Sequence, residues 1–295
     1  NDDHDDVLRS CNDPSYNALF RGTSTGFVGA GYVLTGSVLQ NSANTCRVHV
    51  GDYDGDDHDD ILRSCDNPSY NALILGTSTG FVGAGYVLTG SVLQNSSNTC
   101  RLHVGDYDGD DHDDLLRSCN NPSYNALIHG TGSGFVGAGY VLTGSVLQNS
   151  SNSCRVHVGD YDGDDHDDIL RSCNDPAYNA LFHGTDTSFG GFGYVLTGSV
   201  LQNSANTCRL HVGDYDGNGT DDLLRSCDDN CYNAAWRGLT GGGFASHGYD
   251  LIGSVLQNSN GTCRLHLGNF DLDDTTDLLR SCDSETFNAR WHGLP

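Results

Sequence analysis

The chain has 295 residues, with 39 acidic side chains against 14 basic ones and a formal net charge of −25 at pH 7. A surface of this sign argues against nucleic acid and anionic membranes as partners. There is no run of about 20 apolar residues of the kind that spans or inserts into a membrane. The length allows one large domain.

One segment recurs along the whole chain with a step of 54 residues, which lengthens to 55 before the last copy. The copies begin near residues 46, 100, 154, 208 and 263, and the second half of a further copy begins near residue 1. Self-similarity at this period predicts an array of one supersecondary unit. We therefore expect a single domain over residues 1–295.

The elements of the unit follow in chain order. Residues 1–6 carry the end of an acidic loop, and residues 12–15 are a turn signal. Residues 16–21 predict a strand, 22–31 a glycine-rich connection, and 32–39 a further strand before the turn at 41–45. Residues 47–50 and 61–63 predict two more strands, joined by the acidic loop at 52–60. Four short strands per unit, without helical periodicity, predict an all-β, six-bladed β-propeller with four antiparallel strands in each blade. A stacked β-solenoid is the alternative.

The acidic loop predicts a calcium site. Asp52, Asp54, Asp56 and Asp60 stand at its first, third, fifth and ninth positions, and they repel one another unless a cation neutralises them. Ca²⁺ takes six to eight oxygen ligands, and alternate loop positions supply them. At the seventh position the backbone carbonyl of His58 would serve, because its imidazole suits Zn or Cu better. A solvated acidic loop without an ion is the alternative.

The same spacing predicts the ligands of the other copies, in part only at the start of the chain and with substitutions in the last copy. These residues are Asp106, Asp108, Asp110, His112 and Asp114; Asp160, Asp162, Asp164, His166 and Asp168; Asp214, Asp216, Asn218, Thr220 and Asp222; Asn269, Asp271, Asp273, Thr275 and Asp277; and Asp2 and Asp6.

Ten of the twelve cysteines flank the two loop-bearing strands of the five full copies. In an antiparallel hairpin these positions face each other, so the repeat predicts the disulfides Cys46–Cys65, Cys100–Cys119, Cys154–Cys173, Cys208–Cys227 and Cys263–Cys282. A zinc site is the weaker interpretation, because no CxxC spacing occurs. An oxidised framework indicates a secreted protein. Cys11 and Cys231 remain, and we expect them to link chains into a homo-oligomer.

Three sequons in the turns between units predict N-glycosylation. They begin at Asn95, Asn149 and Asn260.

The pattern GDxDGDxxDD followed by a strand resembles the FG-GAP calcium repeat of integrin α-chain propellers. With hairpin disulfides and a nearly uniform unit, the chain resembles the mushroom lectins built on this propeller. The resemblance implies calcium as cofactor and multivalent binding of glycans and glycoproteins of the galactose or N-acetylgalactosamine type. It also implies that the acidic loop joins the first and second strands of each blade.

A sugar site needs an aromatic face and fixed hydrogen-bonding groups. The residue that ends the third strand varies between copies: Arg21, Leu75, His129, His183, Arg237 and His292. Large apolar residues precede it, among them Trp236 and Trp291, and phenylalanines such as Phe81 and Phe135 follow in the glycine-rich segment. We expect this neighbourhood to bind sugar. The alternatives are that the apolar column is core, that the polar column is only a solvent-facing strand end, and that the site lies at the repeated Ser69-Tyr70-Asn71 turn. The near-identity of that turn between copies favours a packing role instead, with the tyrosine as a corner residue and the asparagine as a cap.

Two other functions compete with a lectin. An integrin-like propeller would recognise protein, but it predicts one unusual surface, whereas these loops repeat. An enzyme is not expected, because a glycosidase needs two carboxylates around one bond and nearly every acidic residue belongs to an acidic loop. Glu285, the one glutamate, lies in a terminal turn.

Overall fold

The structure is a computed structural model that describes residues 6–23, 26–34, 39, 46–88, 93, 100–142, 144, 147, 154–201, 208–249, 256, 263–270, 273, 275–283 and 288–293. These residues form antiparallel strands and single-turn 3-10 helices, and no α-helix occurs among them. No helix in this part of the chain is long and apolar enough to cross a membrane.

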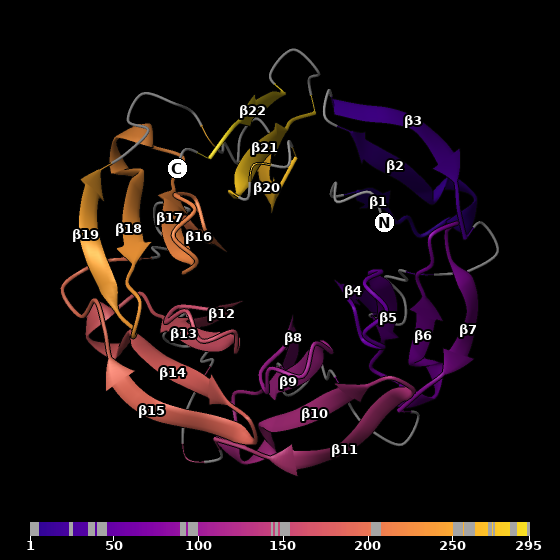
Figure 1. The fold of residues 1–295 in the computed structure, drawn as a ribbon, viewed down its shortest axis with the longest axis horizontal. Coiled ribbons are helices and arrows are strands. Elements are labelled where there is room, and N and C mark those ends of the chain that lie inside the picture. Colours follow the sequence, from indigo (N-terminus) through magenta and orange to yellow (C-terminus); the bar gives the residue numbers. More distant parts are fainter. Residues whose placement is uncertain are drawn as a thin grey trace. The chain divides into compact units, whose positions relative to one another are not determined.

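The strands form six antiparallel sheets, in each of which the spatial order of the strands is their chain order (Figure 1). The first and last sheets are β1 (Val7–Arg9), β2 (Ala18–Thr23) and β3 (Gly26–Tyr32), and β20 (Arg264–Gly268), β21 (Asp277–Ser281) and β22 (Ala289–Trp291). The second sheet is β4 (Arg47–Gly51), β5 (Asp60–Ser64), β6 (Ala72–Leu75) and β7 (Val82–Tyr86). The third is β8 (Arg101–Gly105), β9 (Asp114–Ser118), β10 (Ala126–Thr131) and β11 (Gly134–Tyr140). The fourth is β12 (Arg155–Gly159), β13 (Asp168–Ser172), β14 (Ala180–Thr185) and β15 (Ser188–Tyr194). The fifth is β16 (Arg209–Gly213), β17 (Asp222–Ser226), β18 (Ala234–Gly238) and β19 (Phe244–Tyr249).

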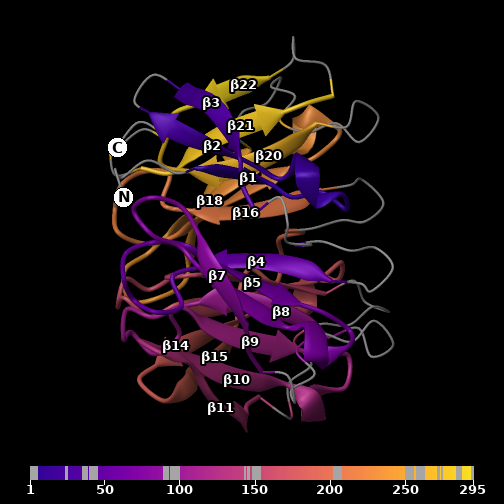
Figure 2. The ribbon, with the colours of Figure 1, turned by 90° about the vertical axis from the view of Figure 1, so that its right-hand side faces the viewer.

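This succession of up-and-down sheets confirms the predicted fold class, an all-β propeller of six blades. Four blades show all four strands, and the first and last show three among the described residues. The chain divides into two compact units, Asn1–Gln148 with Asp186–Ser188, and Asn149–Thr185 with Phe189–Pro295. In the first unit β4 lies beside β8 (Figure 2), and in the second unit β12 lies beside β16.

The core of each unit lies between neighbouring sheets, because alternate residues of each strand point to its two faces. In the first unit Tyr53, Leu62 and Leu73 pack with Leu102 and Leu115 of the next sheet. In the second unit an equivalent cluster holds Tyr161, Leu170, Leu181, Leu210, Leu223 and Trp236.

The prediction for the glycine-rich segment was wrong. Residues 22–31 were expected to connect two strands, with the fourth strand at 32–39, but the fourth strand is β3 itself, which pairs with β2. Glycine is unfavourable within a strand, but backbone pairing with β2 is enough to make this glycine-rich segment the edge strand of its sheet. The register shifts between Leu19 and Arg21, where a bulge makes glycine useful.

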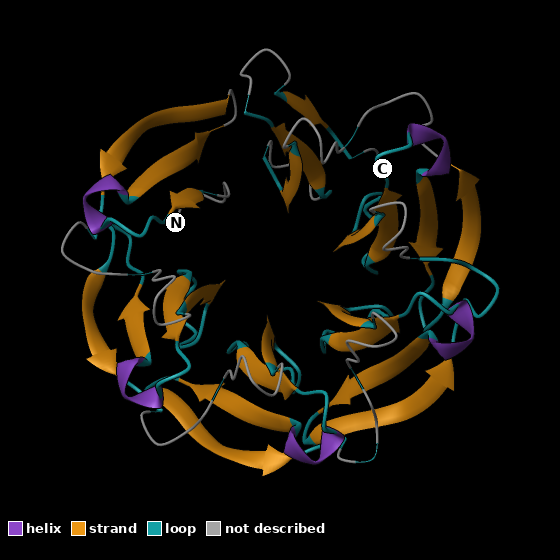
Figure 3. Ribbon diagram, turned by 180° about the vertical axis from the view of Figure 1, so that it is seen from behind, coloured by secondary structure: helices purple, strands orange, loops and turns teal. Residues whose placement is uncertain are grey.

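Each of the first five sheets has a 3-10 turn between its second and third strands (Figure 3). These turns are Pro14–Tyr16, Pro68–Tyr70, Pro122–Tyr124, Pro176–Tyr178 and Asn230–Tyr232. In the second sheet the buried Asn71 ends the turn; its Oδ1 accepts from the Cys65 N–H at 3.0 Å, and its Nδ2 donates to the Leu88 carbonyl at 3.2 Å. The repeated asparagine is therefore structural, as a capping role predicts.

All five predicted hairpin disulfides are present. Each joins the residue before the first strand of a sheet to the residue after its second strand, which the antiparallel register places opposite each other. Cys11 and Cys231 belong to none of these bonds. The framework supports an oxidising, extracellular setting.

Candidate functional site

The acidic loops join the first and second strands of the sheets. In the second sheet backbone N–H groups hold the first and last loop carboxylates. Asp52 Oδ1 accepts from the Gly55 N–H at 2.7 Å, and Asp60 accepts from the Gly76 N–H at 2.7 Å and the Tyr53 N–H at 3.2 Å. Gly55 has a φ of +69°, which glycine adopts without strain. These bonds fix the loop backbone before any ion binds.

The third position of the loop is different, because one oxygen of its carboxylate is buried without a hydrogen-bond partner. This holds in four sheets, at Oδ1 of Asp54, Asp108, Asp162 and Asp216. A buried polar oxygen without a partner is costly. In three loops, three carboxylates also place one oxygen each within 4.8 Å of the others. The donor set therefore fits a hard cation with oxygen ligands, as predicted for Ca²⁺.

The carboxylates of these loops lie in surroundings that disfavour their charge. Burial raises the pKa of Asp60 to about 6, with the Asp54 and Asp52 charges adding to it. Burial likewise raises the pKa of Asp114 to about 7, with a further contribution from Asp108. A cation between the carboxylates would restore the charged form.

The partial and substituted loops keep some of these features. Asp6 Oδ1 accepts from the Gly22 N–H at 2.8 Å, as Asp60 does from Gly76. In the fifth sheet Asn218 Oδ1 accepts the Thr220 N–H at 2.7 Å, and in the sixth Asp273 Oδ1 accepts the Thr275 N–H at 3.0 Å. Asp2 and Asp271 lie outside the described residues.

Loops of neighbouring sheets are joined within each unit. The Asp113 N–H donates to the Asp52 carbonyl at 2.7 Å, and Asp113 Oδ2 accepts from the Asp52 N–H at 2.8 Å. Asp221 and Asp160 form the same pair, at 2.7 and 3.0 Å. The first calcium position of one loop is thus held by the next loop, a contact that the sequence analysis missed.

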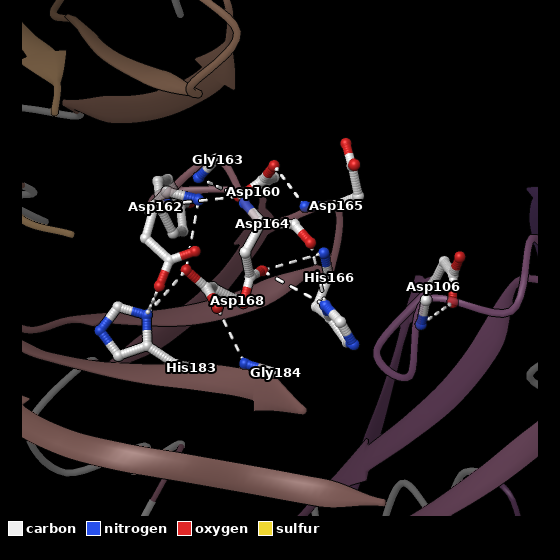
Figure 4. A network of polar contacts seen from close by, with 12 residues as sticks. Asp106, Asp160, Asp162, Gly163, Asp164, Asp165, His166, Asp168, His183 and Gly184 are labelled. Atoms are coloured by element: carbon white, nitrogen blue, oxygen red, sulfur yellow. Dashed lines mark hydrogen bonds and ion pairs between the residues drawn. The ribbon is translucent and has the colours of Figure 1, made fainter. Parts of the chain in front are cut away.

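The polar column at the end of the third strands lies against the acidic loops. His129 Nδ1 lies 2.9 Å from Asp108 Oδ2, and His183 Nδ1 lies 2.9 Å from Asp162 Oδ2 (Figure 4). Arg237 Nε lies 2.6 Å from Asp216 Oδ2. Arg21 is exposed, and His292 lies 3.6 Å from Asp277 Oδ1. In the third, fourth and fifth sheets these side chains thus contact loop carboxylates.

The aromatic residues predicted for a sugar site are largely packed. Trp236 is 6% exposed and belongs to the core of the second unit. Phe135 packs its ring 5.2 Å from that of Tyr53, and Phe81 is half-buried beside a cluster of Leu39, Ile61 and Ile74. Trp291 is half-buried beneath the Arg280 guanidinium, which lies 5.2 Å from its ring. Trp236 is thus a core residue, as the alternative to a sugar site predicted for the apolar residues of the third strands.

A second repeated surface lies at the 3-10 turns. The tyrosine that ends each turn is between 44% and 56% exposed, while its backbone carbonyl accepts from an arginine Nε of the same sheet. These tyrosines are Tyr16, Tyr70, Tyr124, Tyr178 and Tyr232. The sequence analysis favoured a packing role for this turn, and the structure shows that only the asparagine packs. The sequons at Asn95, Asn149 and Asn260 lie outside the described residues.

Two solved structures share this fold. A lectin of Agrocybe aegerita, described by its specific recognition of non-reducing terminal N-acetylglucosamine, matches 94% of this chain and 74% of its own with a TM-score of 0.64 and 14% identity. The Tc holotoxin pore of Photorhabdus luminescens matches 97% of this chain and 14% of its own with a TM-score of 0.62 and 15% identity. No protein-family model and no curated protein matches the sequence. At these identities the likeness establishes the β-propeller class.

Proposed function

We propose that this chain is a secreted, multivalent lectin whose glycan sites recur from sheet to sheet and whose loops are held by Ca²⁺. The observation that carries the proposal is the repeated exposed tyrosine. Five sheets present the same ring at the same turn, and an aromatic face is what the apolar side of a sugar requires. A surface repeated in this way fits a repetitive ligand, and linked weak sites raise avidity by about 10²–10⁴.

Two kinds of likeness support glycan binding. The sequence resembles the mushroom propeller lectins, among them the galactose-binding lectin of the oyster mushroom, and the fold is shared with the N-acetylglucosamine-binding lectin of Agrocybe aegerita. We expect galactose or N-acetylgalactosamine to be the sugar. A glycan array decides between these sugars, and silence across the array with the fold preserved would favour a protein-recognition propeller instead.

Two positions compete for the sugar, the turn tyrosines and the polar column with its neighbouring phenylalanines. Replacing Tyr16, Tyr70, Tyr124, Tyr178 and Tyr232 together by Ala tests the first position. Replacing the polar column together by Ala tests the second, at Arg21, His129, His183, Arg237 and His292. Loss of hapten-inhibitable binding in only one set of variants assigns the site. Unchanged binding in both sets, with unchanged melting, would contradict both assignments.

Calcium acts through the fold in this proposal. An ion that binds the native state alone stabilises it by mass action, about 2.7 kcal/mol per site at 100 times its Kd. Chelator should therefore lower the melting temperature and abolish glycan binding, and Ca²⁺ should restore both. An unchanged melting curve after exhaustive chelation at raised temperature would contradict this role.

A further inference from the structure

Two of the acidic loops have a histidine ring against their carboxylates. His129 Nδ1 lies 2.9 Å from Asp108 Oδ2 and 3.3 Å from Asp114 Oδ2. In the next sheet His183 Nδ1 lies 2.9 Å from Asp162 Oδ2 and 3.2 Å from Asp168 Oδ2 (Figure 4). In each sheet the three ligand atoms converge from two elements that are separated in sequence, the loop and the third strand.

The buried carboxylate in this cluster has an oxygen to spare. The Asp114 side chain has no exposed surface; its Oδ1 accepts from the Gly130 N–H at 2.8 Å, and its Oδ2 has no hydrogen-bond partner and lies 3.3 Å from His129 Nδ1. His129 Nδ1 and Asp108 Oδ1 are also buried without a hydrogen-bond partner. In the third sheet one bound cation would satisfy these atoms together. In the fourth sheet Asp162 Oδ1 is the buried oxygen without a hydrogen-bond partner, while Asp168 Oδ2 accepts from the Tyr161 N–H at 3.2 Å, so the equivalent ligand set carries the argument there.

The ring of His183 lies close to the backbone of two glycines. A Cβ added at Gly191 would lie 3.0 Å from His183 Cδ2, and one added at Gly242 would lie 3.0 Å from His183 Cε1. Both positions therefore leave the ring the room to lie against Asp162 and Asp168, and a larger residue at either would force a rearrangement.

The spacing and chemistry of the cluster suit a transition metal. Ligand atoms about 3.3 Å apart are those of a tetrahedral ion with bonds of about 2.0–2.1 Å, whereas Ca²⁺ prefers six to eight oxygens at about 2.3–2.6 Å. Imidazole suits zinc-class ions, and carboxylates complete such sites. We propose that the third and fourth sheets each bind a divalent transition-metal ion of the Zn²⁺ or Co²⁺ type, through Asp108, Asp114 and His129 and through Asp162, Asp168 and His183.

The other sheets provide natural comparisons. The second sheet has the same loop, with Leu75 in place of the histidine, so its cluster of Asp52, Asp54 and Asp60 holds carboxylates only. In the fifth sheet the corresponding residue is Arg237, a permanent cation whose Nε lies 2.6 Å from Asp216 Oδ2, so it offers no metal-binding nitrogen. The residue that ends the third strand therefore selects the ion for its sheet. This inference concerns the metal alone and does not depend on glycan binding.

The test is dialysis of the Ca²⁺-loaded protein against Co²⁺ in the presence of excess Ca²⁺. The retained Co²⁺ is counted by elemental analysis, and its visible absorption reports nitrogen ligation at low coordination number. Wild type should retain about two Co²⁺ more than the variant with His129→Leu and His183→Leu, in which both sites take the side chain natural at Leu75. Equal retention in the two proteins would overturn the proposal.

The reverse substitution tests sufficiency. Leu75→His should add about one retained Co²⁺ and raise the absorption in proportion. A variant that retains no more than wild type would overturn the claim that this one residue selects the ion. Melting in Ca²⁺ checks that each variant is folded; if the leucine pair does not fold, His129→Asn and His183→Asn replace it with the same expected loss.

Discussion

At the scale of single residues, the carboxylate at the third loop position has one buried oxygen that no protein group hydrogen-bonds. Asp54 Oδ1 is buried without a hydrogen-bond partner, whereas Asp60 is held by two backbone N–H groups. The third position should therefore respond to metal removal more than the ninth, which the protein itself keeps in place.

Asp54→Asn should remove one bound Ca²⁺ per chain and lower stability by about 2–3 kcal/mol in excess Ca²⁺, because the mass-action contribution of one site disappears. Asp57→Asn is the matched control, since it removes the same charge from the same loop at an exposed position outside the predicted ligand set. Calcium counting and thermal melting measure both. Equal losses in the two variants would show that general charge, and not ligation, matters.

A second group of residues links stability to pH. The His157 ring lies in the first strand of the fourth sheet, with Nε2 2.9 Å from Ser172 Oγ, and burial lowers its pKa from 6.5 to about 3. Burial also lowers the pKa of His49 and of His211 to about 4. Below pH 6.5 the unfolded chain takes up protons at these residues while the folded chain does not, so stability falls with falling pH.

In Ca²⁺-saturated protein, these histidines should therefore lower the unfolding free energy between pH 6.5 and 4. One such histidine costs about 2 kcal/mol by pH 5, since each pKa unit is worth about 1.4 kcal/mol. In His157→Gln the loss of unfolding free energy between pH 7.5 and pH 5 should be smaller than in wild type by about 2 kcal/mol. Chemical denaturation of both proteins at pH 7.5 and pH 5 measures the difference, and parallel curves would contradict the burial of a neutral ring.

At the scale of elements, the joined loops predict communication between sheets of one unit. Asp113→Ala should weaken Ca²⁺ binding at residues 52–60, although Asp113 belongs to the following loop. The substitution leaves the Asp52 N–H without its acceptor, at a cost of about 1–3 kcal/mol.

Asp113→Asn keeps an acceptor oxygen and should bind almost as wild type does. Calcium titration of both variants is the measurement. A loss confined to the variant's own loop would show that neighbouring loops load independently.

Much of each hairpin could be predicted from sequence, because the information is local. The alternation of residue types in 47–50 predicted β4, and the spacing of the acidic residues predicted the loop. The cysteines at the two ends of the hairpin predicted its disulfide. The fourth strand was missed because glycine content argues against a strand, while pairing with β2 decides it.

The contacts of the candidate site that escaped prediction all depend on tertiary register. His129 meets Asp114 because β10 pairs beside β9, and no local pattern shows that the ring turns toward the loop. Tyr70 and Asn71 are neighbours in one repeated turn, yet one is exposed and the other buried. Because both residues recur in nearly every repeat, the sequence alone did not distinguish the exposed tyrosine from the buried asparagine.

At the scale of the whole molecule, two cysteines remain outside the hairpin disulfides. Cys231 is exposed at a turn, where another chain can reach it, whereas Cys11 is half-buried. The adjacent Asp229 raises the pKa of the Cys231 thiol, which slows its oxidation. We expect a slowly formed, disulfide-linked dimer through Cys231.

Non-reducing electrophoresis of the oxidised protein should show a dimer band that is absent from Cys231→Ser and still present in Cys11→Ser. A dimer band retained in Cys231→Ser would show that the intermolecular disulfide forms through Cys11. A monomer band alone after prolonged oxidation would contradict the covalent dimer.

The position of the disulfides has a consequence for how such a chain can grow. Both cysteines of each bond lie 19 residues apart within one repeat, so a duplicated or deleted 54-residue segment carries a complete bond and leaves no orphan thiol. The loop contact also re-forms, because a new copy supplies Asp113-like and Asp52-like residues to its neighbours. Unequal recombination between copies thus preserves the disulfide and the loop contacts of every remaining repeat and changes only the number of sheets.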